Sequence, residues 1–316
     1  MTGMNEIRKV PVSAGAEWLL GGFALLRRAP LGLGLLGAIW GLLSMGVVLA
    51  ASAGEFADLA AFGAATTLGL LLQLALALAG PLLFAGLVWA AHEVDQGRAP
   101  APSSLLAGIR EGHTRSLLST LLPQALAGIV LGALLLALLG PDGVQHSADV
   151  FARMQAMSQS GSQPDPQEVE ALAASLPAGR ILLWLLLVFA AGIAVSLALF
   201  LSVPQILFGR ATGPAAMRNS LRASLHNAGA VLVYLLLAGI ALFAIAFATQ
   251  IVALIAQFVF GMTVGLMIGQ LLMMAVVMPL LAGSVYAAWK QLFAGTAGDG
   301  TVGAEPPAAP GNVIAA

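Results

Sequence analysis

The chain has 316 residues, of which 59% are hydrophobic and 9% are charged, and its formal net charge at pH 7 is −1. Since an average soluble domain carries roughly 25% charged residues, this composition excludes an ordinary water-soluble globule and indicates an outer surface that faces lipid. The lack of a basic excess argues against a nucleic-acid partner, and the absence of cysteine excludes thiolate chemistry, cysteine metal sites and disulfides.

Six apolar segments are long enough to cross a bilayer, which takes about 20 residues of helix. They are continuous and rich in Leu and Ala, without the alternation of a membrane β-strand, so we expect an all-α, polytopic transmembrane helical bundle. The boundary between the last two is the weakest, and there Gln257 and Gly261 offer a turn. The expected spans are 31–51, 64–91, 117–139, 181–208, 228–253 and 263–289.

The basic residues predict the orientation of these spans. All 13 Lys and Arg residues except Arg153 and Arg180 fall on one side of the membrane, and positively charged loops stay in the cytoplasm. We therefore expect a protein of the bacterial inner (cytoplasmic) membrane with both termini inside. Residues 1–294 would form the transmembrane domain, and 295–316, rich in Gly, Ala and Pro, a disordered cytoplasmic tail.

One outer loop, residues 140–179, is long and acidic. It predicts two short helices, 148–158 and 167–176, separated by a Ser/Gly/Pro break. Two interpretations of this loop stay open, namely a surface cap on the bundle and a docking site for a partner protein.

The six spans resemble three copies of one unit, each an amphipathic cytoplasmic helix followed by a transmembrane hairpin. The three amphipathic helices are expected at 14–28, 104–115 and 214–226. Their apolar stripes (Leu19, Phe23 and Leu26 in the first; Met217, Leu221 and Leu225 in the third) would face lipid, with arginines reaching the phosphates. The candidate lipid-phosphate contacts are Arg27, Arg28, Arg110, Arg115, Arg218 and Arg222.

Every second span carries a proline, namely Pro81, Pro204 and Pro279. An interior proline removes a backbone hydrogen bond and kinks a helix. These candidate kinks have two interpretations, bent helices that pack together or a hinge that gates a path.

Uncharged polar residues are the other notable feature of the spans. Glutamine amides in lipid usually bond between helices, but they can also line a polar path for an amphipathic molecule; the candidates are Gln73, Gln124, Gln205, Gln250 and Gln270. Gly-x-x-x-Gly pairs at Gly261/Gly265/Gly269, Gly37/Gly41 and Gly128/Gly132 offer close-approach faces for neighbouring helices or for a homo-oligomer.

Catalytic signatures are missing from the sequence. None of the spans carries an ionisable residue well inside it, which argues against a proton-driven pump. His92-Glu93 lacks the second histidine of a zinc protease, and the sequence has no nucleophile elbow, Walker A loop or dinucleotide-binding fingerprint. We expect no cofactor and no catalytic or metal-binding residue. A lipid-modifying enzyme would need cytoplasmic-face residues to converge, and those available are His92, Glu93, Asp95, His113 and His226.

Several short stretches resemble an uncharacterised proteobacterial family of six-span inner-membrane proteins. They are Arg8-Lys9-Val10-Pro11 with Arg27-Arg28-Ala29-Pro30, Gly80-Pro81-Leu82-Leu83, and Ser220-Leu221-Arg222-Ala223 with His226-Asn227. More loosely, the repeated unit is similar to YciC-like proteins and to the membrane domain of some glycerophosphodiester phosphodiesterases. The resemblance implies location and topology and no established activity.

Two functional interpretations follow. The first is a non-catalytic inner-membrane protein with a structural, lipid-contacting or partner-binding role in the envelope. The alternative is a carrier or channel for an apolar or amphipathic small molecule or lipid. The expected partners are membrane lipids, together with a protein partner or a second copy of the chain.

Overall fold

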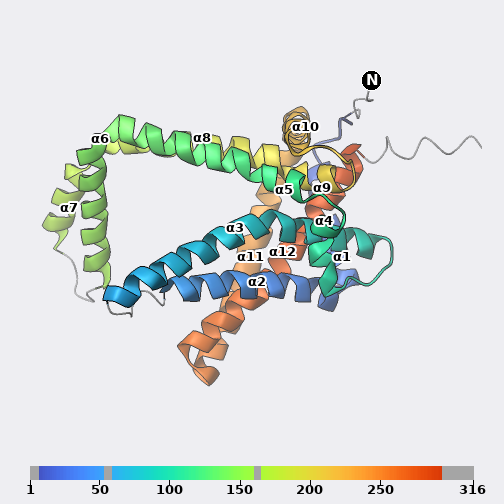
Figure 1. Ribbon diagram of the computed structural model, residues 1–316, viewed down its shortest axis with the longest axis horizontal. Helices are drawn as coiled ribbons and strands as arrows, with labels where there is room; N and C mark the ends of the chain where they lie inside the picture. Colours follow the sequence, from blue (N-terminus) through green and yellow to red (C-terminus); the bar gives the residue numbers. More distant parts are fainter. Residues whose placement is uncertain (1–6, 53–58, 160–164, 294–316) are drawn as a thin grey trace, which may run out of the picture. The chain divides into compact units, whose positions relative to one another are not determined.

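The computed structural model describes residues 7–52, 59–159 and 165–293, and the regular structure in these ranges is helical (Figure 1). Five helical segments are long and apolar enough to cross a membrane, and a bent pair at the amino-terminal end makes a sixth when it is counted as one span. The chain is therefore a multi-pass helical membrane protein. The expected tail, 295–316, lies outside the described residues.

The helices form two compact units. The first comprises residues 1–46, 87–104 and 225–316, and the second comprises 47–86 and 105–224. Each unit has its own packing, and the candidate site lies within the first.

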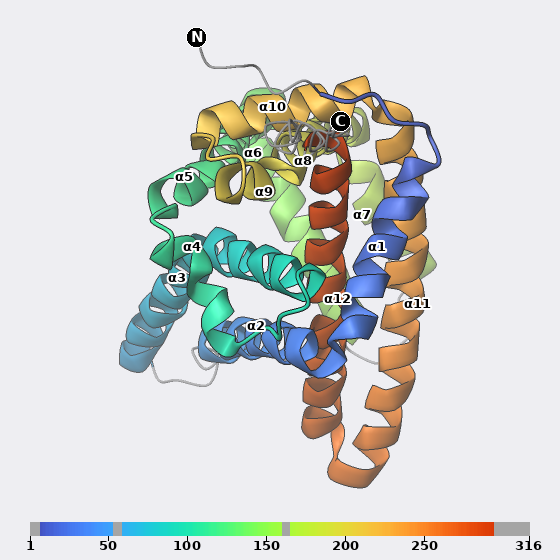
Figure 2. The ribbon, with the colours of Figure 1, turned by 90° about the vertical axis from the view of Figure 1, so that its right-hand side faces the viewer.

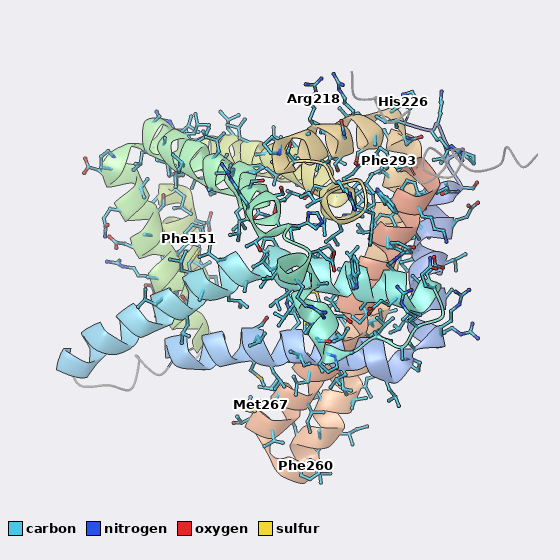
Figure 3. All side chains as sticks on the ribbon, turned by 45° about the vertical axis from the view of Figure 1, so that its right-hand side comes forward. Phe151, Arg218, His226, Phe260, Met267 and Phe293 are labelled. Carbon is cyan, nitrogen blue, oxygen red and sulfur yellow. The ribbon has the colours of Figure 1, made fainter. Side chains whose placement is uncertain are left out.

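A helical hairpin is the frame of the first unit. It consists of α11 (Ala228–Phe260) and α12 (Met262–Phe293), joined at Gly261, whose φ of +88° suits a glycine. The sequence offers Gln257 and Gly261 as turn residues, and the structure turns at Gly261 alone, because α11 continues through Gln257. A Cβ at Gly269 would lie 2.6 Å from Cβ of Ala253, so this glycine is needed where the two helices touch. Figure 3 shows Phe260 and Met267 at one end of the hairpin and Phe293 at the other.

Helix α1 (Ala14–Arg28) packs along both α11 and α12 (Figure 2). Its contact face carries glycines: a Cβ at Gly15 would lie 2.7 Å from the backbone nitrogen of Tyr234, and one at Gly22 would lie 2.6 Å from the carbonyl oxygen of Leu280. The expected lipid-facing stripe of this helix is therefore wrong for Leu19, which is buried. Glycines on that side let the backbone approach the hairpin and draw Leu19 inward.

Helix α2 (Pro30–Ser52) follows after a sharp bend, and the angle between α1 and α2 is 104°. The bend lies at Ala29, which precedes a proline and is extended in φ, as residues before proline usually are. Gly37 of α2 packs on α12, where an added Cβ would lie 2.5 Å from the carbonyl oxygen of Met274. The last turns of α3 (Leu59–Asp95), from residue 87 onward, complete this unit.

The second amphipathic helix expected at 104–115 is not a single helix. The structure has η2 (Pro102–Leu106), α4 (Ala107–Arg110), α5 (Thr114–Leu118) and η3 (Ser119–Leu121) in this region. Gly112, at φ +76°, separates α4 from α5, and this left-handed conformation ends a helix. The third amphipathic helix is present as α10 (Gly213–His226), which buries small residues such as Ala216 and Ala223 and exposes Leu225.

The long acidic loop contains the two helices that its sequence predicts. Helix α6 (Leu122–Gln159) bends at Gly140, where φ is +73° and Pro141 follows, so its second half covers the first predicted stretch. Helix α7 (Pro166–Ser175) is capped at its amino-terminal end by Asp165, whose side chain accepts a hydrogen bond from the backbone N–H of Gln167 at 3.0 Å. His146 of α6 and Ser175 of α7 are joined by a 3.1 Å hydrogen bond.

The three prolines have different surroundings. α3 and α12 are continuous through Pro81 and Pro279. Pro204 instead follows a break at Leu201 that divides α8 (Ala178–Phe200) from α9 (Ser202–Leu207). Ser220 of α10 closes this break, because its hydroxyl accepts the Leu201 N–H at 2.9 Å and donates to the Leu197 carbonyl at 2.8 Å.

Large apolar side chains cover the outside of the long helices. Phe243 is 74% exposed and Phe258 is 92% exposed, and leucines such as Leu126 and Leu182 are exposed as well. Exposed apolar area on this scale would be costly in water, so these faces are lipid-facing surfaces.

Candidate functional site

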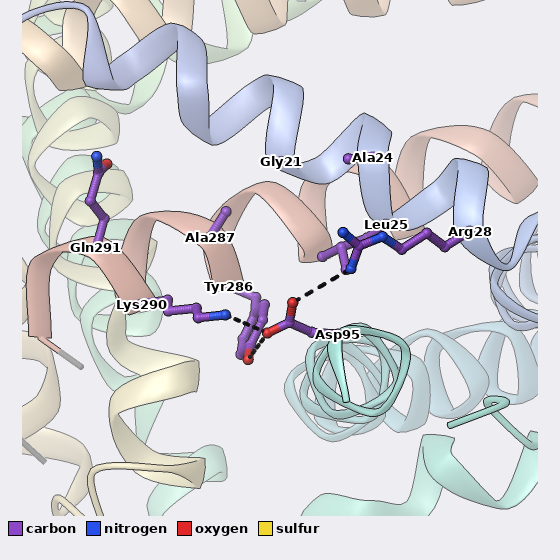
Figure 4. Close-up of a pocket in the computed structure, with 9 residues that line it drawn as sticks. All are labelled: Gly21, Ala24, Leu25, Arg28, Asp95, Tyr286, Ala287, Lys290 and Gln291. Atoms are coloured by element: carbon purple, nitrogen blue, oxygen red, sulfur yellow. Dashed lines mark hydrogen bonds and ion pairs between the residues drawn. The ribbon is translucent and has the colours of Figure 1, made fainter. Parts of the chain in front are cut away.

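A cluster of polar side chains joins the ends of three helices in the first unit. We call it the Asp95 cluster, and it consists of Arg28 from the end of α1, His92 and Asp95 from the end of α3, and Tyr286 and Lys290 from the end of α12. Figure 4 shows Asp95 between Arg28 on one side and Lys290 and Tyr286 on the other.

Asp95 is the common acceptor of the cluster. Its Oδ2 accepts from Nζ of Lys290 at 2.6 Å and from the Tyr286 hydroxyl at 3.0 Å. Nη1 of Arg28 lies 3.8 Å from Oδ1, which is an ion-pair distance but too long for a hydrogen bond. One carboxylate therefore faces two cations, and it hydrogen-bonds one of them.

The bonding pattern fixes the proton on His92. Nδ1 of His92 lies 3.0 Å from the Tyr286 hydroxyl oxygen. A tyrosine hydroxyl has one proton, and that of Tyr286 is donated to Asp95. Nδ1 of His92 must therefore carry the hydrogen and donate it to the Tyr286 oxygen, which gives a chain of donors from His92 through Tyr286 to Asp95.

Neighbouring polar groups form further hydrogen bonds, both within α3 and between helices. Glu93 accepts from the Ser104 hydroxyl at 2.7 Å and from Nε1 of Trp89 at 3.3 Å. Gln291 of α12 accepts from Nε1 of Trp18 and donates to Glu17 at 2.9 Å, so α12 is also tied to α1. Glu93 thereby ties the end of α3 to Ser104, and Gln291 ties α12 to α1.

A hollow of about 360 Å³ opens beside Asp95. Its polar edge is formed by Arg28, Asp95 and Lys290, and its floor by small residues where α1 meets α12, including Gly21, Ala24 and Ala287. Pockets for small molecules usually measure roughly 300–1,000 Å³, so this hollow is large enough for a headgroup-sized ligand. A second hollow of about 340 Å³ shares Arg28 and Asp95 and adds Arg98.

The two cations are more accessible than Asp95. The side chains of Arg28 and Lys290 are 60% and 55% exposed, against 19% for Asp95. An ion pair this exposed contributes about 0–1 kcal/mol. The side chain of Arg28 makes no hydrogen bond to the described residues, so its guanidinium donors are available to a ligand.

The arginines singled out in the sequence are all exposed, with Arg218 and Arg222 inside α10 and the other four at or near helix ends. The structure brings one of them, Arg28, to a hollow. The five candidate glutamines are not gathered in this way: Gln73, Gln124 and Gln250 are exposed, Gln270 is half-buried and Gln205 is buried. None of the five lines either hollow.

The glycine pairs also separate. Gly37, Gly41, Gly265 and Gly269 are used where helices of the first unit touch, whereas Gly128 and Gly132 of α6 have open space beside them.

Of the candidate acid–base residues, the structure joins His92 to Asp95 through Tyr286. His113 precedes α5 in the second unit, and His226 is exposed at the end of α10. Sequence reasoning missed Tyr286 and used Lys290 for topology alone. A signal was present, because the Pro279-Leu-Leu stretch is similar to the Pro81-Leu-Leu stretch when one residue is dropped. In that alignment Tyr286 and Lys290 correspond to Trp89 and Glu93.

Comparison of the chain with protein-family models, curated proteins and solved structures finds no match.

Proposed function

We propose that the chain is a non-catalytic, multi-pass protein of the bacterial inner membrane that acts by contacting lipid at its cytoplasmic face. The supporting observation is the way its acid–base groups are used. His92, Glu93 and Asp95 are each engaged in hydrogen bonds that tie α3 to its neighbours. Glu93 and Asp95 accept hydrogen bonds from neighbouring segments, and His92 donates one to Tyr286, so the three groups serve helix packing. A general base would instead direct a lone pair at a substrate.

The proposed topology has six spans and cytoplasmic termini. The distribution of Lys and Arg supports it, and so does the length of the hairpin. At 1.5 Å per residue, the 33 residues of α11 extend about 50 Å, against about 30 Å of hydrocarbon. The ends of α11 and α12 that pack with α1 would then project into the headgroup region, where the charges of the Asp95 cluster are well solvated. We also interpret the six spans as three repeated units, of which the first and third keep a continuous amphipathic helix.

The test is mass spectrometry of the protein extracted from its native membrane in a lipid-retaining polymer, with an unrelated six-span protein as control. We expect phospholipid species enriched over the control and no lipid product whose amount depends on His92 or Asp95. A lipid product that disappears in His92→Gln would assign an enzyme, and the absence of any enriched lipid would refute a lipid-contacting role.

One observation favours the alternative of a carrier for an amphipathic molecule. Gln205 of α9 is 1% exposed, and its amide nitrogen has no hydrogen-bond partner among the residues that the structure describes. Buried donors of this kind are rare without a function or a bound water. If Gln205 lines a path, Gln205→Met should abolish uptake of an amphipathic tracer into proteoliposomes, whereas Gln124→Met, at an exposed site, should leave uptake unchanged.

A further inference from the structure

We propose that the hollow between α1 and α12 binds the phosphate of an anionic phospholipid headgroup, with Arg28 and Lys290 as its donors. This inference rests on the proposed lipid-contacting function and names the site and the ligand class. Three features carry it: unequal charge at the rim, free donors on Arg28, and an apolar surface that begins next to the cations.

Positively charged side chains outnumber negatively charged ones at the rim of the hollow. Among the residues that line the hollow, Arg28 and Lys290 face the single carboxylate of Asp95. The second hollow repeats this arrangement, with Arg28 and Arg98 around the same carboxylate. Each hollow is therefore lined by two cations and one carboxylate, which leaves a net charge of +1. A phosphodiester carries one negative charge and would balance it.

The hydrogen-bonding capacity is also incomplete. Asp95 takes one of the three N–H donors of Lys290 and approaches Arg28 without a hydrogen bond. The planar guanidinium matches two oxygens of a phosphate, and an ammonium adds a third donor. Asp95 fixes the position of Lys290 at the rim, and Tyr286 fixes Asp95 in turn. The donors are thus positioned before a ligand arrives.

The surface beside the cations suits acyl chains. Leu31 lies three residues after Arg28, at the start of α2, and its side chain is 87% exposed; Leu35, one turn later, is exposed as well. The floor of the hollow is apolar, with Gly21, Ala24 and Ala287. A soluble phosphate would use the cations alone, whereas a phospholipid would use the cations and the apolar face of α2.

The experiment uses the full chain in nanodiscs that contain phosphatidylcholine and increasing fractions of phosphatidylglycerol, with bound lipid counted by native mass spectrometry. The test variant is Arg28→Gln/Lys290→Gln. The matched control is Arg8→Gln/Lys9→Gln, which removes the same charge from exposed residues beside the end of α12 that do not line the hollow.

We expect the test variant to need about thirtyfold more phosphatidylglycerol for half-saturation, since it loses two cations and each contributes about 1 kcal/mol to anionic lipid binding. The control should lose clearly less binding than the test variant, because its cations lie outside the hollow. The charge-conserving variant Arg28→Lys/Lys290→Arg should recover most of the binding, which separates loss of the site from loss of the fold.

Equal binding by the test variant and the wild type, or equal losses in the test and control variants, would overturn the inference while leaving the lipid-contacting role intact. Absence of anionic lipid on the wild type above an unrelated six-span protein would overturn the proposed function itself. Competition by millimolar glycerol phosphate as strong as that by the lipid would overturn the lipid assignment in favour of a soluble phosphate.

Discussion

Nζ of Lys290 lies 2.6 Å from Oδ2 of Asp95, so the last turn of α12 is tied to the last turn of α3. These residues are 195 positions apart in the chain. The same carboxylate accepts the Tyr286 hydroxyl and faces Arg28, and it thereby connects three helices through one side chain.

Asp95→Asn tests whether this carboxylate holds the helix ends together. The amide keeps the shape but removes the charge that Lys290 and Tyr286 bond, so we expect the free energy of unfolding to fall by about 1–2 kcal/mol. Thermal unfolding in detergent, followed by gel filtration, measures the loss. Glu111→Gln removes a charge from an exposed residue and should leave the midpoint unchanged; equal losses in both variants would show that Asp95 has no special role.

Gly22→Ala tests the close approach of α1 to α12. The added Cβ would lie 2.6 Å from the Leu280 carbonyl oxygen, which is backbone and cannot rotate away. We expect a loss of about 1–3 kcal/mol in the free energy of unfolding. Gly239→Ala, in the open face of α11, has nothing within 4 Å and should be neutral or stabilising, by about 0.5–1 kcal/mol. A stabilised Gly22→Ala would show that the two helices do not touch there.

Ser220→Ala tests whether the Ser220 hydroxyl stabilises the break between α8 and α9. The hydroxyl satisfies the N–H of Leu201 and the carbonyl of Leu197, and it is fully buried. Leaving a buried donor unpaired costs about 1–3 kcal/mol. Ser44→Ala removes a hydroxyl that bonds the carbonyl of Trp40 in its own helix and should cost less. Hydrogen exchange at Leu201 reports the opening directly, and unchanged protection would contradict the role of Ser220.

The membrane class and the position of the helices could be predicted from the sequence, because the length and continuity of apolar runs are local properties. The turn at Gly261 and the bend at Gly140 are local too, since both glycines take a conformation that other residues avoid. The single helix expected at 104–115 is wrong. The regular spacing of apolar residues predicts it, but Gly112 takes a left-handed conformation that separates α4 from α5.

The candidate site was only partly predictable. Arg28 was identified as a phosphate contact from its place at the end of an amphipathic helix. Its partners come from helices that are far apart in the sequence, namely Asp95 from α3 and Tyr286 and Lys290 from α12. No regular spacing of residues along the chain predicts that they meet. The packing of α1 along the hairpin, through Gly15 and Gly22, brings these residues together.

The absence of cysteine allows a clean test of topology. Single cysteines at Ser13 and Glu168 would be exposed to an impermeant maleimide in spheroplasts, one variant at a time. We expect Glu168→Cys to label in intact spheroplasts and Ser13→Cys to label after permeabilisation only. Labelling of Ser13→Cys from outside would mean that the bent pair α1–α2 does not cross the membrane, which leaves five spans.

Contact between Lys290 and a lipid phosphate can be measured directly, because lysine occurs at positions 9 and 290 alone in the sequence. Solid-state NMR dephasing between ³¹P of phosphatidylglycerol and ¹⁵Nζ of lysine, in Lys9→Gln protein, reports on Lys290 by itself. A hydrogen-bonded ammonium and phosphate place nitrogen and phosphorus about 4 Å apart, and we expect dephasing that corresponds to this distance. A ¹⁵N signal that shows no dephasing in bilayers saturated with phosphatidylglycerol would contradict a headgroup site at the Asp95 cluster.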